Sequence, residues 1–280
     1  MYGNVDYEKL KVRARLLRGD LLTMLNKAGS GHSGGSLSSM EILTVLYNGV
    51  MKHNPNNPNW EERDRFVLSK GHVCPALYVV LADCGYFERE ELATLRQYGS
   101  ILQGHPFMDK TPGLDVSSGS LGQGLSVAVG MALAAKKGEQ GQRVYCLMGD
   151  GELQEGQIWE AAMSAAHYRL GNLCGIVDYN GLQIDGRTSE VMDLGMLEEK
   201  WKSFNWNTIV ADGHDVEALY QAYVNAASTI GKPSVIIAHT EKGKGVSFME
   251  GNAAWHGVAP NDAELTIALR ELNCEGVKLC

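Results

Sequence analysis

Short apolar runs alternate with longer, helix-favouring runs along most of the chain. Residues 144–148 (VYCLM) are apolar, long enough for one buried strand and too short for a helix. Residues 149–151 (GDG) interrupt this run, and residues 153–167 are rich in Glu, Gln, Ala and Met, which favour helix. Gly171 and Asn172 are expected to cap that helix, before a second apolar run at residues 173–178. The pattern predicts a strand–helix–strand unit with parallel strands.

The same alternation extends to the rest of the chain. Further strands are predicted at residues 65–69, 207–211 and 234–239, and further helices at residues 7–26, 38–50, 73–84, 88–98, 125–136, 215–227 and 261–272. Strands and helices that alternate in this way predict an α/β fold with a mostly parallel sheet and helices on both of its faces. We expect a single domain over residues 1–280, because no repeat or low-complexity linker divides the chain.

The composition restricts the kind of partner. Hydrophobic residues make up 44% of the chain, and the formal net charge is -8. Lys and Arg form no run, which argues against nucleic acid or an anionic membrane as the main partner. No apolar run reaches membrane-spanning length, and the charged N-terminal residues lack the apolar core of a signal peptide. The cysteines form no C-x-x-C pair, so we expect reduced thiols in a cytoplasmic protein.

Two polar residues follow the strands of the central unit, Asp150 after the first and Asn180 after the second. Ligands of doubly wound sheets bind at these carboxyl ends. A carboxylate and an amide oxygen are hard ligands that suit Mg²⁺, which also keeps water and phosphate oxygens in its shell. The N–H groups at the start of the following helix are ready for phosphate. This indicates a Mg²⁺-bridged diphosphate site; the alternative is an ordinary Gly-Asp-Gly turn and a loop asparagine.

Four histidines stand beside glycines in predicted loops: His32, His72, His105 and His256. Imidazole can donate to phosphate, move a proton near neutral pH or bind a sugar hydroxyl. No pair of histidines has the i, i+3 or i, i+4 spacing of a zinc site. The shared setting favours a common role for the four side chains at the diphosphate site.

Other segments are less specific. His53, His167 and His239 have no special setting and are expected to be structural or surface residues. His214 precedes a predicted helix and is either part of its entry turn or functional. The Gly-rich residues 119–124 open another helix and suit close backbone approach to a cofactor, but they lack dinucleotide-fold spacing.

Six motifs give the chain a resemblance to the N-terminal, diphosphate-binding half of transketolase. They lie, in the order of that family, at residues 30–35 (SGHSGG), 69–72 (SKGH), 104–106 (GHP), 119–124 (GSLGQG), 149–156 (GDGELQEG) and 255–257 (WHG). The G-D-G followed by Asn180 is similar to the thiamine diphosphate signature. The motifs cover nearly all of the chain. The resemblance implies the thiamine diphosphate-binding fold, with thiamine diphosphate and Mg²⁺ (or Ca²⁺ or Mn²⁺) as cofactors.

The resemblance also implies a role for each matching residue. The metal ligands would be Asp150, Asn180 and the main-chain carbonyl of Leu182. The diphosphate would be contacted by His72, the Gly151 amide and His256, and the aminopyrimidine by Gly119, Ser120 and Leu121. The sugar would face His32, His105 and His256, which would assist proton transfers. Glu155 and Glu160 would lie at a contact between chains, in a carboxylate network beside the cofactor.

Two departures from the family pattern bear on these roles. Ser120 stands where the family usually has proline, which loosens that loop. The family's glutamate for the aminopyrimidine and its arginines for the substrate phosphate belong to a following domain, which nothing after His256 supplies. The resemblance thus implies a split enzyme. Its partner chain would carry the pyrimidine-binding and C-terminal domains, and the assembly would be a heterotetramer with each cofactor between two chains.

The implied reaction is the reversible transfer of a two-carbon ketol unit from a ketose to an aldose, as in the pentose phosphate pathway. The ketose is a sugar phosphate or a modified ketose such as a sulfonated one. Two alternatives remain open. The α subunit of a 2-oxoacid dehydrogenase shares the G-D-G and asparagine, but it would not account for residues 104–106 and 119–124. The second alternative is a chain that binds the cofactor but catalyses no reaction of its own.

Overall fold

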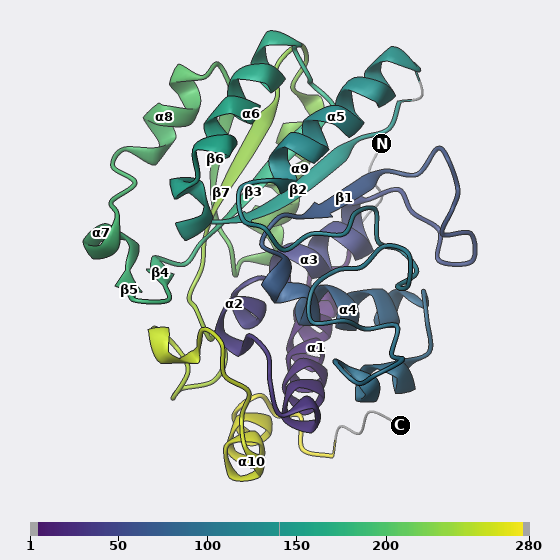
Figure 1. Cartoon of the computed structure of the whole chain (residues 1–280), viewed down its shortest axis with the longest axis vertical. Helices are drawn as coiled ribbons and strands as arrows, with labels where there is room; N and C mark the ends of the chain where they lie inside the picture. The colour runs from purple at the N-terminus through teal and green to yellow at the C-terminus, as the bar shows by residue number, and fades with distance from the viewer. Residues whose placement is uncertain (1–4, 140, 277–280) are drawn as a thin grey trace.

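A five-stranded parallel sheet forms the centre of the molecule (Figure 1). The computed structural model describes residues 5–139 and 141–276. The strands lie in the order β1–β2–β3–β7–β6, and all neighbours are parallel. They are β1 (Arg65–Leu68), β2 (Val144–Gly149), β3 (Leu173–Tyr179), β6 (Asn207–Asp212) and β7 (Ser234–His239). A small antiparallel pair consists of β4 (Leu182–Gln183) and β5 (Gly186–Arg187). The predicted α/β fold with a mostly parallel sheet is confirmed.

Helices cover the sheet, joined by short helical segments of other types. The α-helices are α1 (Tyr7–Ala28), α2 (Ser33–Ser38), α3 (Met40–Val45), α4 (Cys74–Cys84), α5 (Gly124–Lys137), α6 (Gly156–His167), α7 (Thr188–Val191), α8 (Leu197–Ser203), α9 (Val216–Ser228) and α10 (Asp262–Glu271). The other segments are the π-helix η1 (Leu46–Val50) and the 3₁₀ helices η2 (Gly71–Val73), η3 (Arg89–Thr94), η4 (Gly151–Gln154) and η5 (Ala253–Trp255). Within the described ranges, no helix is both long and apolar enough to cross a membrane.

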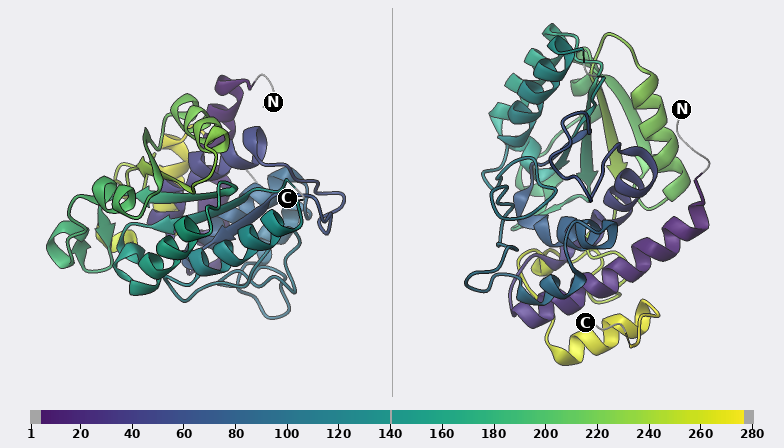
Figure 2. Two further views of the ribbon diagram at one scale, coloured as in Figure 1. Left: turned by 90° about the horizontal axis from the view of Figure 1, so that it is seen from above. Right: turned by 90° about the vertical axis from the view of Figure 1, so that its right-hand side faces the viewer.

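Both faces of the sheet are buried, because alternate residues of each strand enter different cores. Tyr145 and Leu147 of β2 pack into the core that contains residues of α1, α3, α4 and α9. Val144, Cys146 and Met148 of the same strand pack into the core that contains residues of α5, α6 and α8. In the right-hand view of Figure 2 the strands lie between the teal helices α5 and α6 and the light green α9. Helices on both faces are thus confirmed.

The register of the central strands defines the location of the site. Gly149, the last residue of β2, lies opposite Asp178 in β3. The residues that follow these strands, Asp150 and Asn180, therefore leave adjacent strands at the same edge of the sheet. The loops after β1 and β7 leave at that edge too, since all these strands are parallel. Four loops that are distant in sequence thereby meet in one place.

Three local predictions are wrong. The helix expected at residues 38–50 begins at Ser33 and is interrupted at Ser39, whose hydroxyl donates to Gly35 O (2.8 Å) and competes with the helical pattern. Its last turn is the π-helix η1, closed by a Met51 N to Leu46 O bond of 2.7 Å. The helix expected at residues 88–98 is only the short η3, and the chain turns away at Arg96, which adopts a φ of 63°.

The third wrong prediction concerns the end of α6. The helix ends at His167, and the left-handed residue that terminates it is Arg169 (φ 51°), so Gly171 and Asn172 are not its cap. Gly171 instead allows a close approach, because a Cβ there would meet Gly231 N at 3.0 Å. The short elements β4, β5, α7 and α8 between Leu182 and Ser203 escaped prediction, because none is long enough to show a periodicity.

The cysteines in the described ranges are all free thiols: Cys74, Cys84, Cys146, Cys174 and Cys274. Cys146 and Cys174 lie within β2 and β3 and are fully buried, as predicted for strand residues. Cys280 lies outside the described residues. These thiols belong to the packed interior and surface, and we assign them no chemistry.

Candidate active site

A pocket of about 390 Å³ opens at the carboxyl edge of the sheet. Most of the residues predicted for the cofactor and the sugar line it: His32, His72, Gly119, Leu121, Asp150, Gly151, Glu155, Asn180, Leu182 and His256. His105, Ser120 and Glu160 are not among its lining residues. The fold thus brings together motifs from the two ends and the middle of the chain.

Asp150 joins the two loops that carry the predicted metal ligands. Its Oδ1 accepts from Gly151 N (2.8 Å) and its Oδ2 from Gly181 N (2.6 Å). Asn180 Oδ1 accepts from Leu182 N (3.1 Å), which turns the loop after β3 back on itself. Asp150, Asn180 and Leu182 are therefore close neighbours at the end of β2 and β3, and each contributes an oxygen atom to this region.

The carboxylate of Asp150 is buried without a cationic partner. Its residue is 2% exposed, and no Lys, Arg or His of the described residues forms an ion pair with it. Burial, reinforced by the nearby charge of Asp178, raises the pKa of Asp150 to about 6. A divalent cation would favour the ionised carboxylate and reverse this rise. The donor set of carboxylate, amide and carbonyl oxygens suits Mg²⁺, Ca²⁺ or Mn²⁺.

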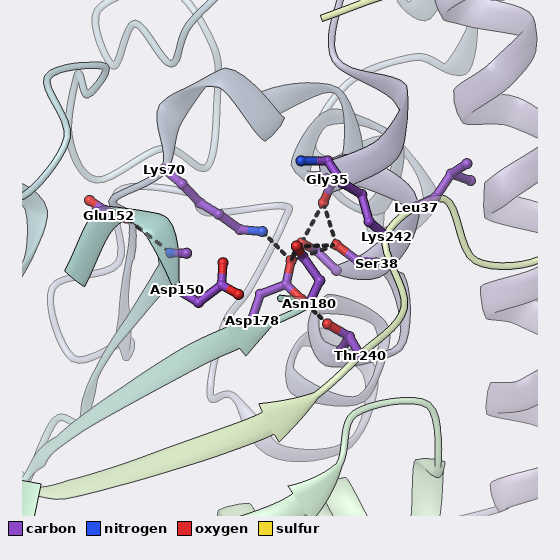
Figure 3. Close-up of polar contacts among 12 residues, drawn as sticks. Gly35, Leu37, Ser38, Lys70, Asp150, Glu152, Asp178, Asn180, Thr240 and Lys242 are labelled. Atoms are coloured by element: carbon purple, nitrogen blue, oxygen red, sulfur yellow. Dashed lines mark hydrogen bonds and ion pairs between the residues drawn. The ribbon is translucent and has the colours of Figure 1, made fainter. Parts of the chain in front are cut away.

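Beside Asp150 lies a buried ion pair between Lys70 and Asp178, shown in Figure 3. Asp178 also accepts from Ser38 Oγ (2.5 Å), Thr240 Oγ1 and Asn180 Nδ2 (3.3 Å). Burial alone would raise the pKa of Asp178, but the Lys70 ammonium and the hydroxyls of Ser38 and Thr240 hold it below its ordinary value. Asp178 is therefore an ionised anchor under the site, and the charge of Lys70 is already neutralised.

Three imidazoles form a cluster in the wall of the pocket. The ring centroids of His32 and His72 are 5.0 Å apart, those of His72 and His256 are 5.2 Å apart, and those of His32 and His256 are 5.6 Å apart. Burial, with neighbouring positive charges as the next cause, lowers the pKa of His32 to about 4, of His72 to about 2 and of His256 to about 4. All three are neutral at pH 7. His32 Nδ1 is buried without a hydrogen-bond partner among the described residues, so it is available to a ligand.

Lys242, in the loop after β7, supplies a cation that the sequence did not reveal. Its residue is 2% exposed, and its Nζ lies 3.0 Å from His256 Nδ1 and 3.3 Å from Leu182 O. None of the described carboxylates forms an ion pair with it. Burial, with the charge of Lys70 next, lowers its pKa to about 8. A buried ammonium that has no carboxylate partner suits an anionic ligand.

The remaining predicted cofactor and sugar contacts lie at the rim. The ring of His105 covers Gly119, where a Cβ would meet its Cδ2 at 3.1 Å. His105 is exposed, and partial burial together with the charge of Arg96 lowers its pKa. Ser120 and Leu121 are exposed beside it. These residues form a shallow lip next to the pocket, with only Gly119 and Leu121 in its wall.

A third buried carboxylate, Glu152, ties three segments of the site together. It accepts from Ser69 Oγ, from Gly122 N (2.8 Å) and from Gly149 N (3.0 Å). These donors belong to the loop after β1, to the loop before α5 and to the end of β2. Glu152 is 3% exposed, so its position is determined by these bonds and not by solvent.

Glu155 and Glu160 both point outward. Glu155 lines the edge of the pocket, and a Cβ on Gly122 would meet its Cβ at 2.6 Å. Glu160 lies on the exposed surface of α6, away from the pocket. Within the described part of the chain, neither side chain makes a hydrogen bond or an ion pair, so both remain available to a group outside this chain.

Sequence reasoning missed Lys70, Asp178, Glu152 and Lys242. The signal for the two lysines was their position in the loop after a strand, since Lys70 follows β1 and Lys242 follows β7 at the edge where ligands bind. Asp178 is a carboxylate within an otherwise apolar strand, a feature that calls for a partner. Nothing local distinguishes Glu152 from the exposed glutamates of the same motif.

Comparison with known proteins identifies the class. The thiamine diphosphate binding domain of transketolase matches residues 9–277. The chain is 48% identical over 267 residues to the 6-deoxy-6-sulfo-D-fructose transketolase subunit SqwG of Clostridium sp. (strain MSTE9), a match that covers 95% of this chain and 97% of that protein. It is 45% identical over 269 residues to an apulose-4-phosphate transketolase subunit of Phocaeicola vulgatus, a match that covers 96% of this chain and 95% of that one. This chain therefore belongs to the transketolase family and carries its thiamine diphosphate-binding domain.

Longer transketolases match only in part. Human transketolase is 41% identical over 260 residues, which cover 91% of this chain and 41% of that protein. The crystal structure of transketolase from Campylobacter jejuni superposes with a TM-score of 0.92 at 34% sequence identity, over 99% of this chain and 44% of that chain. In extent, the chain matches the subunits of split transketolases and less than half of an undivided transketolase.

Proposed function

We propose that this chain is the N-terminal, cofactor-anchoring subunit of a two-chain transketolase. The observation that carries the proposal is a pair of buried charges in one pocket: among the described residues, neither the Asp150 carboxylate nor the Lys242 ammonium forms an ion pair. A divalent cation bound to a diphosphate would neutralise both charges, because the cation pairs with the carboxylate and the diphosphate pairs with the ammonium. The similarity to transketolase subunits over nearly their whole length supports the same function.

The metal would be held by oxygen atoms of Asp150, Asn180 and the Leu182 main chain. The neighbouring Gly151 amide opens η4 and, with the imidazoles of His72 and His256, would contact the diphosphate. Three protein ligands leave room for diphosphate oxygens and water, which is the shell that Mg²⁺ prefers. Ca²⁺ and Mn²⁺ accept the same oxygen donors.

Lys242 would add a charge-assisted contact to the diphosphate, whereas Lys70 is already paired with Asp178. The aminopyrimidine would lie along the exposed lip formed by Gly119, Ser120 and Leu121. Serine at position 120 retains a backbone N–H that proline would lack.

When bound, thiamine diphosphate supplies the electron sink that allows a C–C bond beside a ketose carbonyl to break. This chain's contribution is to bind, orient and move protons. His32 and His256 are neutral at pH 7, since burial keeps each pKa at about 4, so each can accept a proton from a sugar hydroxyl and return it. His105, at the exposed rim, would face the part of the sugar that extends out of the pocket.

The partner subunit would close the open side of the pocket. Leu121 and Ile184, which line its mouth, are 37% and 69% exposed, more than a finished site would leave to solvent. Glu155 lies at the edge of the pocket and Glu160 is exposed on α6, and both would meet the second chain. Residues 1–280 would then form a single diphosphate-binding domain, the partner would supply the pyrimidine-binding and C-terminal domains, and two copies of each would assemble as a heterotetramer.

The substrate would be a ketose that carries an anionic group, either phosphate or sulfonate, and the acceptor an aldose. The names of the two similar subunits, for a sulfo-fructose and for apulose 4-phosphate, support this class. If the ketose carries a phosphate, the enzyme would act in the pentose phosphate pathway. The free thiols of the described residues fit a reducing, cytoplasmic setting.

The test is co-expression with a candidate partner subunit, followed by assay with Mg²⁺ and thiamine diphosphate. We expect ketol transfer from a phosphorylated or sulfonated ketose to an aldose. Oxidation of pyruvate with an artificial electron acceptor, in place of ketol transfer, would assign the chain to the 2-oxoacid dehydrogenases. If the assembled complex binds the cofactor but catalyses neither ketol transfer nor pyruvate oxidation, only a binding role remains for the chain.

A further inference from the structure

His214 connects two parts of the molecule that are distant in sequence. It lies in the turn between β6 and α9, and its side chain is 16% exposed. On one side its Nδ1 lies 2.9 Å from Glu41 Oε2 of α3. On the other side the main-chain amide of Glu241 donates to its Nε2 at 2.8 Å. Glu241 directly precedes Lys242, the buried cation of the pocket.

These two contacts define one tautomer of the imidazole. A carboxylate only accepts hydrogen bonds, so Nδ1 carries the proton and donates to Glu41. A main-chain amide only donates, so Nε2 is the acceptor for Glu241. Neutral His214 with its proton on Nδ1 satisfies both partners. The ring therefore acts as a fixed link with one donor and one acceptor.

The Glu41 end of the link is rigid. Arg18 of α1 donates two hydrogen bonds to the Glu41 carboxylate, one of 2.6 Å from Nη2, and a third of 3.2 Å to Leu37 O. The side chains of Arg18 and Glu41 are 5% and 9% exposed. A bidentate pair buried in this way has little freedom, so His214 is anchored to a fixed point in the helical layer.

The other end is a loop in which the amides of Thr240, Glu241 and Gly243 have separate anchors. Thr240 N donates to Tyr179 O (3.1 Å), and Gly243 N donates to Gly34 O (3.0 Å). Between these two points, the Glu241 amide is bonded only to His214 among the described residues. His214 is thus the attachment nearest to Lys242 on its N-terminal side.

The turn that carries His214 is built for this contact. Gly213 N donates to His239 O at 2.7 Å, and a Cβ at Gly213 would meet Thr240 Cγ2 at 2.3 Å. Only glycine permits this approach of the turn to the end of β7. Asp212 Oδ1 accepts from His214 N (2.9 Å), which orients the histidine backbone. The segment is therefore the entry turn of α9 and also a contact between that turn and the loop after β7.

We propose that His214 is a positioning residue for the cofactor site, which holds the Glu241–Lys242 backbone so that the Lys242 ammonium is directed at the diphosphate. This rests on the proposed function, because it needs a diphosphate beside Lys242. It assigns His214 no contact with the cofactor. Its effect on affinity passes through Lys242 alone, and that consequence separates it from a general structural role.

The first test needs no cofactor. In His214→Phe, which keeps the ring and removes both hydrogen bonds, amide hydrogen exchange at Glu241 should rise at least about tenfold, while exchange in α5 and α6 stays unchanged. The matched control is His53→Phe, because His53 is also half-buried and bonded through both ring nitrogens, to Tyr86 Oη (3.0 Å) and Tyr47 O (2.7 Å), remote from the site. Unchanged exchange at Glu241 in His214→Phe would overturn the proposal.

The second test is a double-mutant cycle on thiamine diphosphate affinity, measured by calorimetry with Mg²⁺ on the complex with the partner subunit. His214→Phe should weaken binding about tenfold in the wild-type background, as loss of an outer-shell partner does, and less than about twofold in Lys242→Met. Equal losses in both backgrounds would mean a general structural role and would overturn the proposal. His214→Gln, which offers a donor and an acceptor side by side, should restore part of the affinity.

The two tests separate failure of the inference from failure of the proposed function. If the wild-type complex does not bind thiamine diphosphate, the proposed function fails, whatever the exchange data say. If it binds, and the loss in His214→Phe persists without Lys242, then only the positioning role fails. His53→Phe should leave the affinity within about twofold of wild type, because its hydrogen bonds lie in another part of the fold.

Discussion

The ammonium of Lys70 and the carboxylate of Asp178 form an ion pair that is sealed from solvent, with side chains 3% and 0% exposed. Because this carboxylate only accepts, the amide nitrogen of Asn180 faces it at 3.3 Å and the amide oxygen faces away. The oxygen is the atom that a metal would require. The pair therefore does more than neutralise two charges, since it also selects the orientation of Asn180.

Lys70→Met should destabilise the protein by roughly 3–5 kcal/mol, because it leaves Asp178 buried without its cation. The double variant Lys70→Met/Asp178→Asn should recover a large part of that loss, since neither charge then remains. Urea denaturation at pH 7 measures both. Lys202→Met removes the exposed pair with Glu199 and serves as the control that should leave the midpoint unchanged. A similar loss in the single and double variants would contradict this account.

Asp150→Ala should abolish Mg²⁺-dependent binding of thiamine diphosphate. The substitution removes the buried carboxylate that would coordinate the metal and also the bonds that join the loops after β2 and β3. Calorimetry with Mg²⁺, and again after addition of EDTA, measures the dependence. Asp193→Ala changes an exposed aspartate whose carboxylate accepts from Gly195 N, and should bind normally. Retained Mg²⁺-dependent affinity in Asp150→Ala would remove Asp150 from the metal site.

The central strand–turn–helix unit was predictable because both of its strands are buried on two faces and read as apolar runs, with Asp178 as the charged residue within the second. Their parallel pairing places Asp150 and Asn180 at one edge, so the position of the site followed from the strands alone. The helix boundaries near Ser39 and Arg96 were not predictable, because a side-chain hydrogen bond and a single left-handed residue decide them.

The charges of the site were harder to foresee than its histidines. Lys242 follows a strand at the correct edge, but its importance depends on its forming no ion pair with a described carboxylate, which only the packing reveals. The same holds for Glu152, whose three donors come from three separate loops. Sequence patterns identify which residues gather at an edge. They do not identify which buried charges remain unmatched there.

Glu41 should contribute to the acid sensitivity of the fold. Burial alone would raise its pKa, but Arg18 and His214 lower it from 4.5 to about 2. Above pH 4.5 the carboxyl is ionised in both the folded and unfolded states, and its stabilisation is complete. As the pH falls below 4.5 the unfolded state takes up a proton first, so the free energy of unfolding declines by about 3 kcal/mol by the folded pKa.

Glu41→Gln removes this titration. The variant should be less stable than wild type at pH 7, because Arg18 loses its buried partner, yet its free energy of unfolding should fall less between pH 4.5 and pH 2. Urea titrations at several pH values across that window measure the difference. Glu198→Gln, at an exposed carboxylate of α8, should follow the wild-type curve. Parallel curves for wild type and Glu41→Gln would contradict the assignment.

His105→Ala should slow ketol transfer far more than it weakens cofactor binding. The ring lies over Gly119 at the exposed rim and, among the described residues, its nitrogens bond to no protein group, so they are free for a sugar hydroxyl. A proton relay of this kind contributes about 10²-fold or more to turnover, whereas the affinity for thiamine diphosphate should change less than about twofold because the ring adds no charge at pH 7. Steady-state kinetics of the complex, with calorimetry on the same samples, separates the two quantities. His167→Ala, at the exposed end of α6, should leave both unchanged. If turnover of His105→Ala equals that of wild type, the relay consists of His32 and His256 alone.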